Sequence, residues 1–206
     1  MSAKDLTLIL VRMGPTTWDI QGRLCGCTDL PPAPGCLESL RVAIGVAEPD
    51  VEMILHGPGE MAEHLVNLLV EGRDVKVKSL EGLMDVGVGL WEGMLAEEAE
   101  RRYPTLYRQW RLDPMLAAPP EGEPIVEAQE RLLAAIRKGV GRIPAKGRRV
   151  AVLLRPLAFG ATVAALEGNP TSGIWAWAEG ADRLRRVTIP GGDLRGVLDV
   201  RARIGA

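Results

Sequence analysis

The residues best suited to bind an anion follow the first apolar segment of the chain. Residues 6–11 are apolar apart from one threonine, and Arg12 comes next, with Gly14, Thr16 and Thr17 behind it. In a β/α fold, ligands bind beyond the carboxyl ends of the strands. A guanidinium backed by a glycine and two hydroxyls could hold a phosphate or a carboxylate there. The same residue types are common at ordinary strand ends, so the segment alone is compatible with either interpretation.

Further motifs, which follow this segment in order along the chain, help to interpret it. Residues 10–19 read Leu-Val-Arg-Met-Gly-Pro-Thr-Thr-Trp-Asp, and Arg23 follows. Downstream come, in order, Asp29-Leu30-Pro31, Gly89-Leu90-Trp91-Glu92-Gly93, Tyr107-Arg108-Gln109-Trp110, Asp113-Pro114 and Pro119-Pro120-Glu121-Gly122-Glu123. Together with the strand and helix expected before Gly168-Asn169-Pro170, these motifs resemble the histidine phosphatase superfamily, which includes the cofactor-dependent phosphoglycerate mutases. The resemblance covers about residues 6–170.

The resemblance implies a pocket of two arginines and two histidines, and this chain departs from it. Members of the family transfer phosphoryl groups through a phosphohistidine, and that position is Met13 here. The second histidine position is Arg155, and the second phosphate-binding arginine position is Met61. The acid that protonates the leaving group is usually a glutamate and is Asp85 here. Of the four pocket positions, only Arg12 is retained.

These changes predict a family member without catalytic activity. A thioether lacks the nitrogen or oxygen lone pair that attacks phosphorus, and it cannot shuttle a proton. We expect a pocket that binds an anionic or phosphorylated ligand, or else a partner protein, with ligand contacts from Arg12, Thr16, Thr17, Arg23 and Arg155. A pocket filled by Met13 and Met61 as adaptable core residues is an equal alternative. A weak phosphomonoester hydrolase that uses Asp85 and Arg155 around a water molecule is the competing enzyme hypothesis, and a purely structural subunit is a third.

Cysteines and histidines offer weaker candidates. Cys25, at the position of a family glutamine, Cys27 and Cys36 lack the paired spacing of a zinc site, so we expect no metal and no cofactor. Buried, unreactive cysteines are the main expectation, and a reactive Cys25 is the alternative. The two histidines, His56 and His64, match no catalytic position; the first could reach the pocket rim, and the second is expected on a helix surface.

Apolar periodicity predicts the elements that position these residues. Short β-branched segments alternate with helical periods, which favours a three-layer α/β/α domain with a mostly parallel central sheet over residues 1–206. Strands are expected at residues 6–12, 51–55, 75–78, 150–154, 174–178, 186–189 and 197–200, and helices at 37–46, 61–69, 125–139 and 156–168. Residues 81–124, here called the cap segment, contain a charged helical stretch at 95–110 and should cover the pocket.

Composition limits the other function classes. The 206 residues include three cysteines and no apolar stretch long enough for a membrane span, so a cytoplasmic, membrane-free protein is expected. Residues 1–130 carry a net charge of −11 and residues 131–206 a net charge of +9. Because no basic run interleaves with aromatic residues, we expect these charges to mix on one surface and no nucleic acid to bind. Trp175 and Trp177 would share one face of a strand, either in the core or at a homodimer interface.

Overall fold

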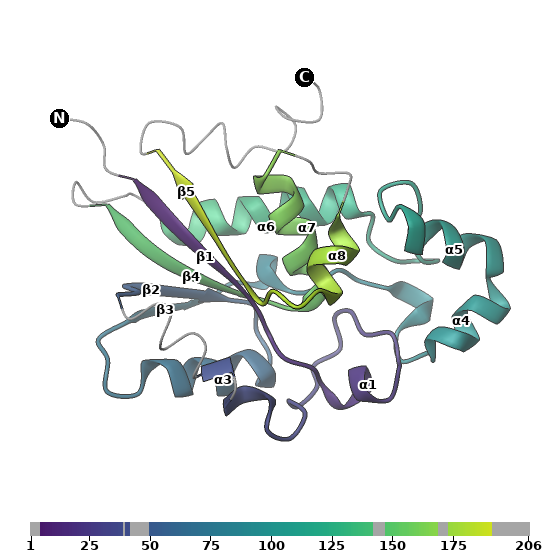
Figure 1. Ribbon diagram of the computed structural model, residues 1–206, viewed down its shortest axis with the longest axis horizontal. Coiled ribbons are helices and arrows are strands. Elements are labelled where there is room, and N and C mark those ends of the chain that lie inside the picture. Colours follow the sequence, from purple (N-terminus) through teal and green to yellow (C-terminus); the bar gives the residue numbers. More distant parts are fainter. Residues whose placement is uncertain (1–4, 39, 42–49, 142–146, 169–172, 191–206) are drawn as a thin grey trace.

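A five-stranded, mostly parallel sheet forms the centre of the computed structural model, which describes residues 5–38, 40–41, 50–141, 147–168 and 173–190. The order of its strands is β3-β2-β4-β1-β5 (Figure 1). Only β5 runs antiparallel, beside β1. The strands are β1 (Leu6–Arg12), β2 (Met53–His56), β3 (Lys76–Ser79), β4 (Arg148–Leu154) and β5 (Leu184–Ile189).

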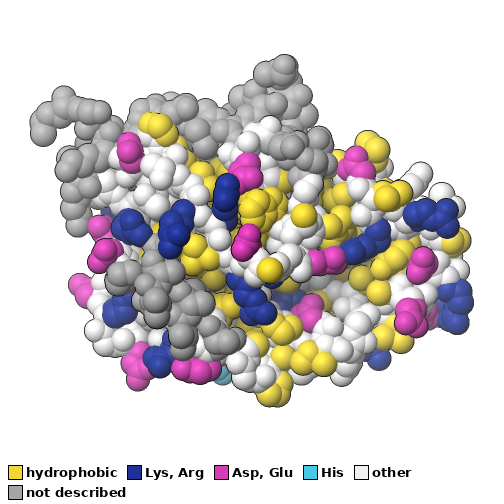
Figure 2. Space-filling view, viewed as in Figure 1, with side chains coloured by type: hydrophobic (Ala, Val, Ile, Leu, Met, Phe, Trp, Pro, Cys, Tyr) yellow, Lys and Arg dark blue, Asp and Glu magenta, His cyan; other side chains and the backbone are white. Residues whose placement is uncertain are grey.

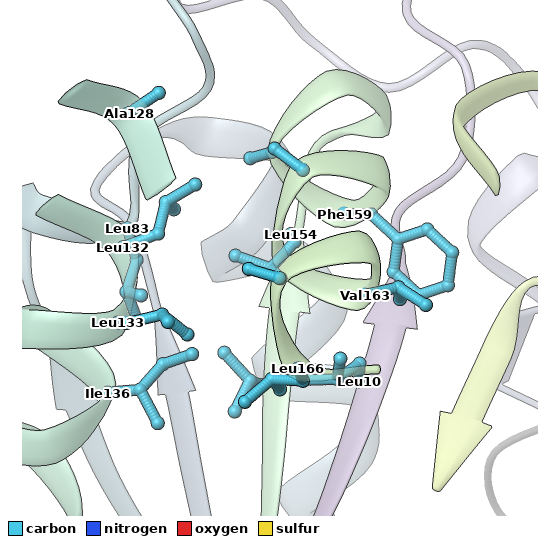
Figure 3. Packing of buried hydrophobic residues seen from close by; sticks show 14 of the residues in the cluster. Leu10, Leu83, Ala128, Leu132, Leu133, Ile136, Leu154, Phe159, Val163 and Leu166 are labelled. Atoms are coloured by element: carbon cyan, nitrogen blue, oxygen red, sulfur yellow. The ribbon is translucent and has the colours of Figure 1, made fainter. Parts of the chain in front are cut away.

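Alternating side chains of the strands build two cores on opposite faces of the sheet. Leu8 and Leu10 pack with α6 (Ile125–Val140) and α7 (Pro156–Leu166), whereas Ile9 and Val11 pack with α3 (Glu60–Val70). Figure 3 shows the first of these cores, with Leu10 and Leu154 of the sheet beneath the apolar faces of both helices. Each fully buried side chain of this size contributes about 1.5–3 kcal/mol. The predicted three-layer α/β/α fold is confirmed.

The cap segment, residues 81–124, is held to the body by aromatic packing. It contains η1 (Glu81–Leu83), η2 (Gly89–Trp91), α4 (Ala96–Arg102) and α5 (Pro104–Leu112). Trp91 is fully buried beside Trp110, whose ring centroid lies 4.6 Å from that of Trp175 outside the segment. The single helical stretch predicted at 95–110 is two helices, because Pro104 lacks the N–H that would continue α4 and instead begins α5.

The strand predicted at residues 174–178 is wrong. These residues form α8 (Ile174–Glu179), which starts after Gly173 in the left-handed conformation. A Cβ at Gly160 of α7 would lie 2.3 Å from the carbonyl oxygen of Ile174, so the two helices pack backbone to backbone. Residues two apart on a helix point about 200° apart, and Trp175 and Trp177 therefore do not share a face. The alternation of Trp and Ala fits the two-residue period of a strand. Packing against α7 instead makes this segment a helix.

Smaller differences concern the edges of the predicted elements. A short helix, α1 (Thr17–Ile20), follows β1 and was not predicted. The strand predicted at residues 75–78 is β3, an edge strand in which Val77 is exposed. Residues 37–38 and 40–41 are helical, while the rest of the helix predicted at 37–46 lies outside the described residues, as does the strand predicted at 197–200.

Two surface properties bear on the excluded function classes. None of the helices in the described part of the chain has the length and apolar character needed to cross a bilayer. Figure 2 shows Lys and Arg side chains interspersed with Asp and Glu on the face in view. Side chains of both signs therefore lie close together on this face.

Candidate ligand-binding site

Two adjoining cavities lie at the carboxyl ends of β1 and β4. The larger has a volume of about 510 Å³ and the smaller about 150 Å³. Met13, Asp85 and Arg155 line both cavities and so stand at their common boundary. Met61, the fourth altered pocket position, lines the smaller one. The four positions that the resemblance grouped together therefore do meet in space.

Pairing of the two central strands places Met13 beside Arg155. Arg12 is in register with Leu154, and the Met13 N–H donates to the Leu154 carbonyl at 2.8 Å. Arg155 follows as the N-cap residue of α7, with Pro156 in the first turn of the helix. Proline fits that position because the first helical N–H groups have no intrahelical acceptor. Met13, to which the resemblance assigns the nucleophile position, is buried.

Arg155 is buried and incompletely paired. One terminal nitrogen, Nη2, donates to Asp19 Oδ2 at 3.4 Å, and Nε lies 3.8 Å from Asp85 Oδ2. The other, Nη1, is buried and has no hydrogen-bond partner among the described residues. Burial by itself lowers the pKa of Arg155, but the carboxylates of Asp85 and Asp19 outweigh it and raise that pKa. The side chain thus carries a permanent charge with donor capacity left over.

Asp85 is buried at the start of α7. Its Oδ1 accepts the N–H of Ala158 at 2.7 Å and that of Val86 at 2.9 Å. Burial raises the pKa of this carboxyl to about 6, against the opposing pull of Arg155 and of the two backbone donors. Arg131 of α6, which sequence reasoning did not single out, donates to the Asp85 carbonyl and fixes the loop. Asp85 is therefore positioned as a helix cap and as a titratable group at the cavity boundary.

Arg12 lines the larger cavity, but its guanidinium is engaged by protein. Nη1 donates to the carbonyls of Trp177, at 2.9 Å, and Ala178, and Nη2 donates to that of Gly180 at 2.5 Å. These carbonyls belong to the end of α8 and would otherwise lack donors. Burial and the nearby Arg183 lower the pKa of Arg12. The one retained pocket arginine thus caps a helix C-terminus.

The other predicted ligand contacts have different roles. Thr16 lines the smaller cavity, but its hydroxyl donates to Asp19 Oδ2 at 2.6 Å and caps α1. Thr17, the first residue of α1, lines neither cavity. Arg23 lines the larger cavity and donates to the Gly93 carbonyl at 2.8 Å. Of the five predicted contacts, only Arg155 retains a buried nitrogen without a partner in the described structure.

Carboxylates of the chain itself occupy the backbone donors around the smaller cavity. Asp29 Oδ1 accepts the N–H of Glu60 at the start of α3 at 2.8 Å. Glu92 Oε1 accepts the N–H groups of Gly26 at 2.9 Å and Thr28 at 3.2 Å. One N–H group at the start of α3 and one at the start of α7 are thus already bound to aspartates.

An aromatic wall that sequence reasoning did not identify borders the larger cavity. It consists of Tyr107, Trp110 and Trp175. The rings of Trp110 and Trp175 meet edge to face at 4.6 Å, and the Arg111 guanidinium lies 4.3 Å above Trp175. Arg111 also binds Glu179 of α8 through both terminal nitrogens. The cap segment and α8 together form this side of the cavity, and only tertiary structure brings them together.

The cysteines and histidines do not form a second reactive centre in the described structure. Cys25 lines the larger cavity, and burial raises its pKa to about 12. Cys27 is exposed, so the expectation of buried cysteines holds for Cys36 alone. His56 is buried, with Nδ1 2.7 Å from the Gly57 carbonyl oxygen, and lines neither cavity; His64 is exposed on α3. Among the described residues, no group of three His, Cys, Asp or Glu side chains could hold a metal ion.

Comparison with known proteins places the chain in a family. The model of the histidine phosphatase superfamily (branch 1) matches residues 8–197. The chain therefore belongs to the histidine phosphatase superfamily, as the motifs predicted. It is 25% identical over 135 residues to Phosphoserine phosphatase 1 of Hydrogenobacter thermophilus, a match that spans 64% of each chain. It is also 25% identical over 185 residues to Probable phosphoglycerate mutase GpmB of Shigella dysenteriae, covering 89% of this chain and 83% of that one.

Solved structures agree with the fold. YhfR of Bacillus stearothermophilus matches with a TM-score of 0.73 at 25% identity, over 83% of this chain and 84% of that one. A mycobacterial glucosyl-3-phosphoglycerate phosphatase, solved with VO3, matches with a TM-score of 0.71 at 20% identity, over 90% and 98% of the two chains.

Proposed function

We propose that this protein binds a small anionic ligand at Arg155 and lacks phosphoryl-transfer activity, including the hydrolysis of phosphate esters. The main evidence for this proposal is the pair of residues at the carboxyl ends of β1 and β4. A buried thioether, Met13, is at the position that the resemblance assigns to the nucleophile, and it lies beside a buried guanidinium, one nitrogen of which has no partner among the described residues. The first residue cannot attack phosphorus, whereas the second can bind an oxygen anion.

The positions of the histidines support the loss of covalent catalysis. The chain has two histidines, and neither His56 nor His64 lines either of these two cavities. Cys25 lines the larger cavity, but a pKa of about 12 keeps its thiol protonated near neutral pH. Removal of a covalent nucleophile costs on the order of 10⁶ in turnover in well-studied hydrolases.

Incomplete pairing of Arg155 supports ligand binding. A buried donor without a partner costs about 1–3 kcal/mol, and more for a charged group. A ligand oxygen near Nη1 would remove that cost and add a charge-assisted hydrogen bond. The larger cavity has the volume of a small-molecule site, which is typically about 300–1,000 Å³.

Hydrolysis by an activated water is the second candidate function. The observation that favours it is Asp85, whose pKa is raised to about 6 and whose Oδ2 lies 3.8 Å from Arg155 Nε. A carboxyl that titrates near neutral pH suits general acid–base chemistry. Relatives whose names describe a phosphatase and a mutase support this candidate too.

A turnover assay on p-nitrophenyl phosphate separates the two candidates. We expect the wild-type protein to give no more p-nitrophenol than the Asp85→Asn variant, and no phosphoprotein in acid-quenched samples with labelled substrate. The exposed Arg108→Met variant serves as a matched control for the effect of a substitution outside the cavities. Turnover in the wild type and control that disappears in Asp85→Asn would establish hydrolysis and overturn the proposal.

A binding measurement tests the other half of the proposal. Phosphate, phosphoesters and carboxylates at millimolar concentrations should include an anion that raises the melting temperature of the wild type. The shift should persist in Arg108→Met and disappear in Arg155→Met. If no anion shifts the wild-type melting temperature, the pocket is a filled core and the proposal fails.

A further inference from the structure

The lining of the larger cavity combines an excess of positive charge with a large apolar surface. Its charged residues are five arginines and three carboxyl groups: Arg12, Arg23, Arg111, Arg155 and Arg183 with Asp19, Asp85 and Glu179. This excess of guanidinium groups favours an anion and is compatible with a phosphate as well as with a carboxylate. The feature of the ligand that the remaining residues of the lining can specify is its body.

Most of these arginines already donate to groups of the protein. Arg12 donates to carbonyls at the end of α8, and Arg23 donates to a backbone carbonyl of the cap segment. Arg111 binds Glu179 through both terminal nitrogens, so their charges offset each other. In the described structure, the buried arginine nitrogen of this cavity that lacks a partner is Nη1 of Arg155. The anionic head of a ligand therefore belongs at Arg155.

The aromatic wall is held in place by contacts within the protein. Trp175 Nε1 donates to the Trp110 carbonyl at 3.0 Å, and the two rings meet edge to face. Tyr107 precedes Trp110 by one turn of α5, and their ring centroids are 6.1 Å apart. Since these rings are ordered before a ligand binds, contact with them costs little side-chain entropy.

Apolar surface extends from the aromatic wall to the anion-binding nitrogen. Pro156 and Leu157, which directly follow Arg155 at the start of α7, line the same cavity. Leu24 and Val88 line it as well. The cavity volume of about 510 Å³ is in the range of small-molecule sites. An inorganic anion at Arg155 would leave most of this apolar surface uncovered.

We infer that the ligand of this site is an anion with a planar aromatic body, whose head binds Arg155 and whose ring packs on the aromatic wall. The inference rests on the proposed function and names the ligand class of the same site. Aromatic rings gain from offset and edge-to-face contacts with one another beyond the area that they bury, and a saturated ring does not. Both a phosphate and a carboxylate provide a suitable head, so probes of both kinds are needed.

Paired probes measure what the ring adds to binding: inorganic phosphate against phenyl phosphate, and acetate against phenylacetate, each titrated by calorimetry into the full chain. In each pair the ring should increase affinity roughly tenfold or more, a difference of about 1.4 kcal/mol. Cyclohexyl phosphate, which has a saturated ring, should bind roughly threefold or more weakly than phenyl phosphate. Pairs of equal affinity, or equal binding of the saturated and aromatic rings, would overturn the inference.

Variants locate the contact with the ring. Trp175→Leu should reduce the affinity for phenyl phosphate roughly tenfold and leave that for inorganic phosphate unchanged. Trp177→Leu is the matched control, because Trp177 belongs to the same helix and lines neither cavity. Arg155→Met should weaken the binding of both anions. An equal loss of both anions in Trp175→Leu, or an equal loss of phenyl phosphate in Trp177→Leu, would contradict the assignment. If Trp175→Leu does not fold, the comparison of the two ring types in the wild type decides the question.

Failure of this inference can be told apart from failure of the proposed function. Anions that bind through Arg155 with no gain from the ring refute the inference and leave the proposed function intact. Hydrolysis of phenyl phosphate refutes the proposed function, whereas acetate and phenylacetate still measure the gain from the ring. If no probe binds at millimolar concentrations, both are wrong.

Discussion

Asp85 Oδ1 accepts the backbone N–H of Ala158 at 2.7 Å, so a side chain from the cap segment closes the first turn of α7. The same carboxyl faces Arg155 across the cavity boundary. Its charge therefore affects both the stability of the helix start and the electrostatics of the site.

Stability should fall between about pH 4 and pH 6 because of Asp85. Burial raises the folded-state pKa of Asp85 to about 6 from an ordinary value of 3.8, so the folded protein binds this proton more tightly than the unfolded chain. The resulting stabilisation is fully present below about pH 4 and is lost as the pH rises through about 6. At about 1.4 kcal/mol per pKa unit, the loss is on the order of 3 kcal/mol.

Urea unfolding at a series of pH values measures this effect. The Asp85→Asn variant has no proton to lose at this position, and its profile should lack this fall while retaining the contributions of other carboxylates. Parallel profiles for the two proteins between pH 4 and pH 6 would show that Asp85 is not the group responsible.

Arg12→Met should destabilise the protein by roughly 2–4 kcal/mol, because several carbonyls at the end of α8 lose charge-assisted donors. Arg12→Lys should lose less, since an ammonium still donates but cannot span the same carbonyls. The free energy of unfolding in urea measures both. If Arg12 instead binds the ligand, Arg12→Met will reduce anion affinity as much as Arg155→Met does, with little change in stability.

Met61→Arg should shift ligand preference toward phosphate. The substitution brings a second guanidinium to the smaller cavity, which Arg155 already lines, and each charged hydrogen bond contributes about 1.5–3 kcal/mol. Inorganic phosphate and phenyl phosphate should bind roughly tenfold or more tightly than to the wild type, as measured by calorimetry. The matched cationic control is Val77→Arg on the exposed edge strand. Met53→Arg is unsuitable because Met53 is buried in β2. An equal gain in Val77→Arg would reveal a general charge effect.

The Arg111–Glu179 pair should couple α5 to α8 weakly. Its two hydrogen bonds form at a partly exposed surface, where such pairs contribute about 0–1 kcal/mol. A double-mutant cycle with Arg111→Met and Glu179→Gln should give a coupling of about 0.5–1 kcal/mol that decreases in high salt. A coupling that salt does not change would point to packing of Arg111 on Trp175 instead.

The core elements were predictable because their signals are local. Residues 6–12 and 150–154 are apolar and β-branched enough to define buried strands, and the helices over 125–139 and 156–168 have clear start or stop residues. Residues 174–178 were mispredicted because alternating Trp and Ala fits a strand locally, whereas close packing against Gly160 of α7 favours a helix.

The residues of the site were predictable from the sequence, but their hydrogen-bonding partners were not. Motif spacing brought Met13, Met61, Asp85 and Arg155 together, and the structure places them around two adjoining cavities. That Arg12 binds the end of α8, and that Thr16 caps α1, depends on segments far apart or on local geometry that residue types do not specify. The aromatic wall joins the cap segment to α8, so no single stretch of sequence contains it.

The strand order has a consequence for how the chain folds. β1 is made first, yet its two neighbours are β4 (Arg148–Leu154) and β5 (Leu184–Ile189), from the last third of the sequence. During synthesis, this almost wholly apolar strand therefore cannot form its hydrogen bonds until most of the polypeptide has been made. Such non-local pairing slows folding and leaves aggregation-prone surface exposed meanwhile. Nascent chains that end before β4 should therefore depend on chaperones to stay in solution.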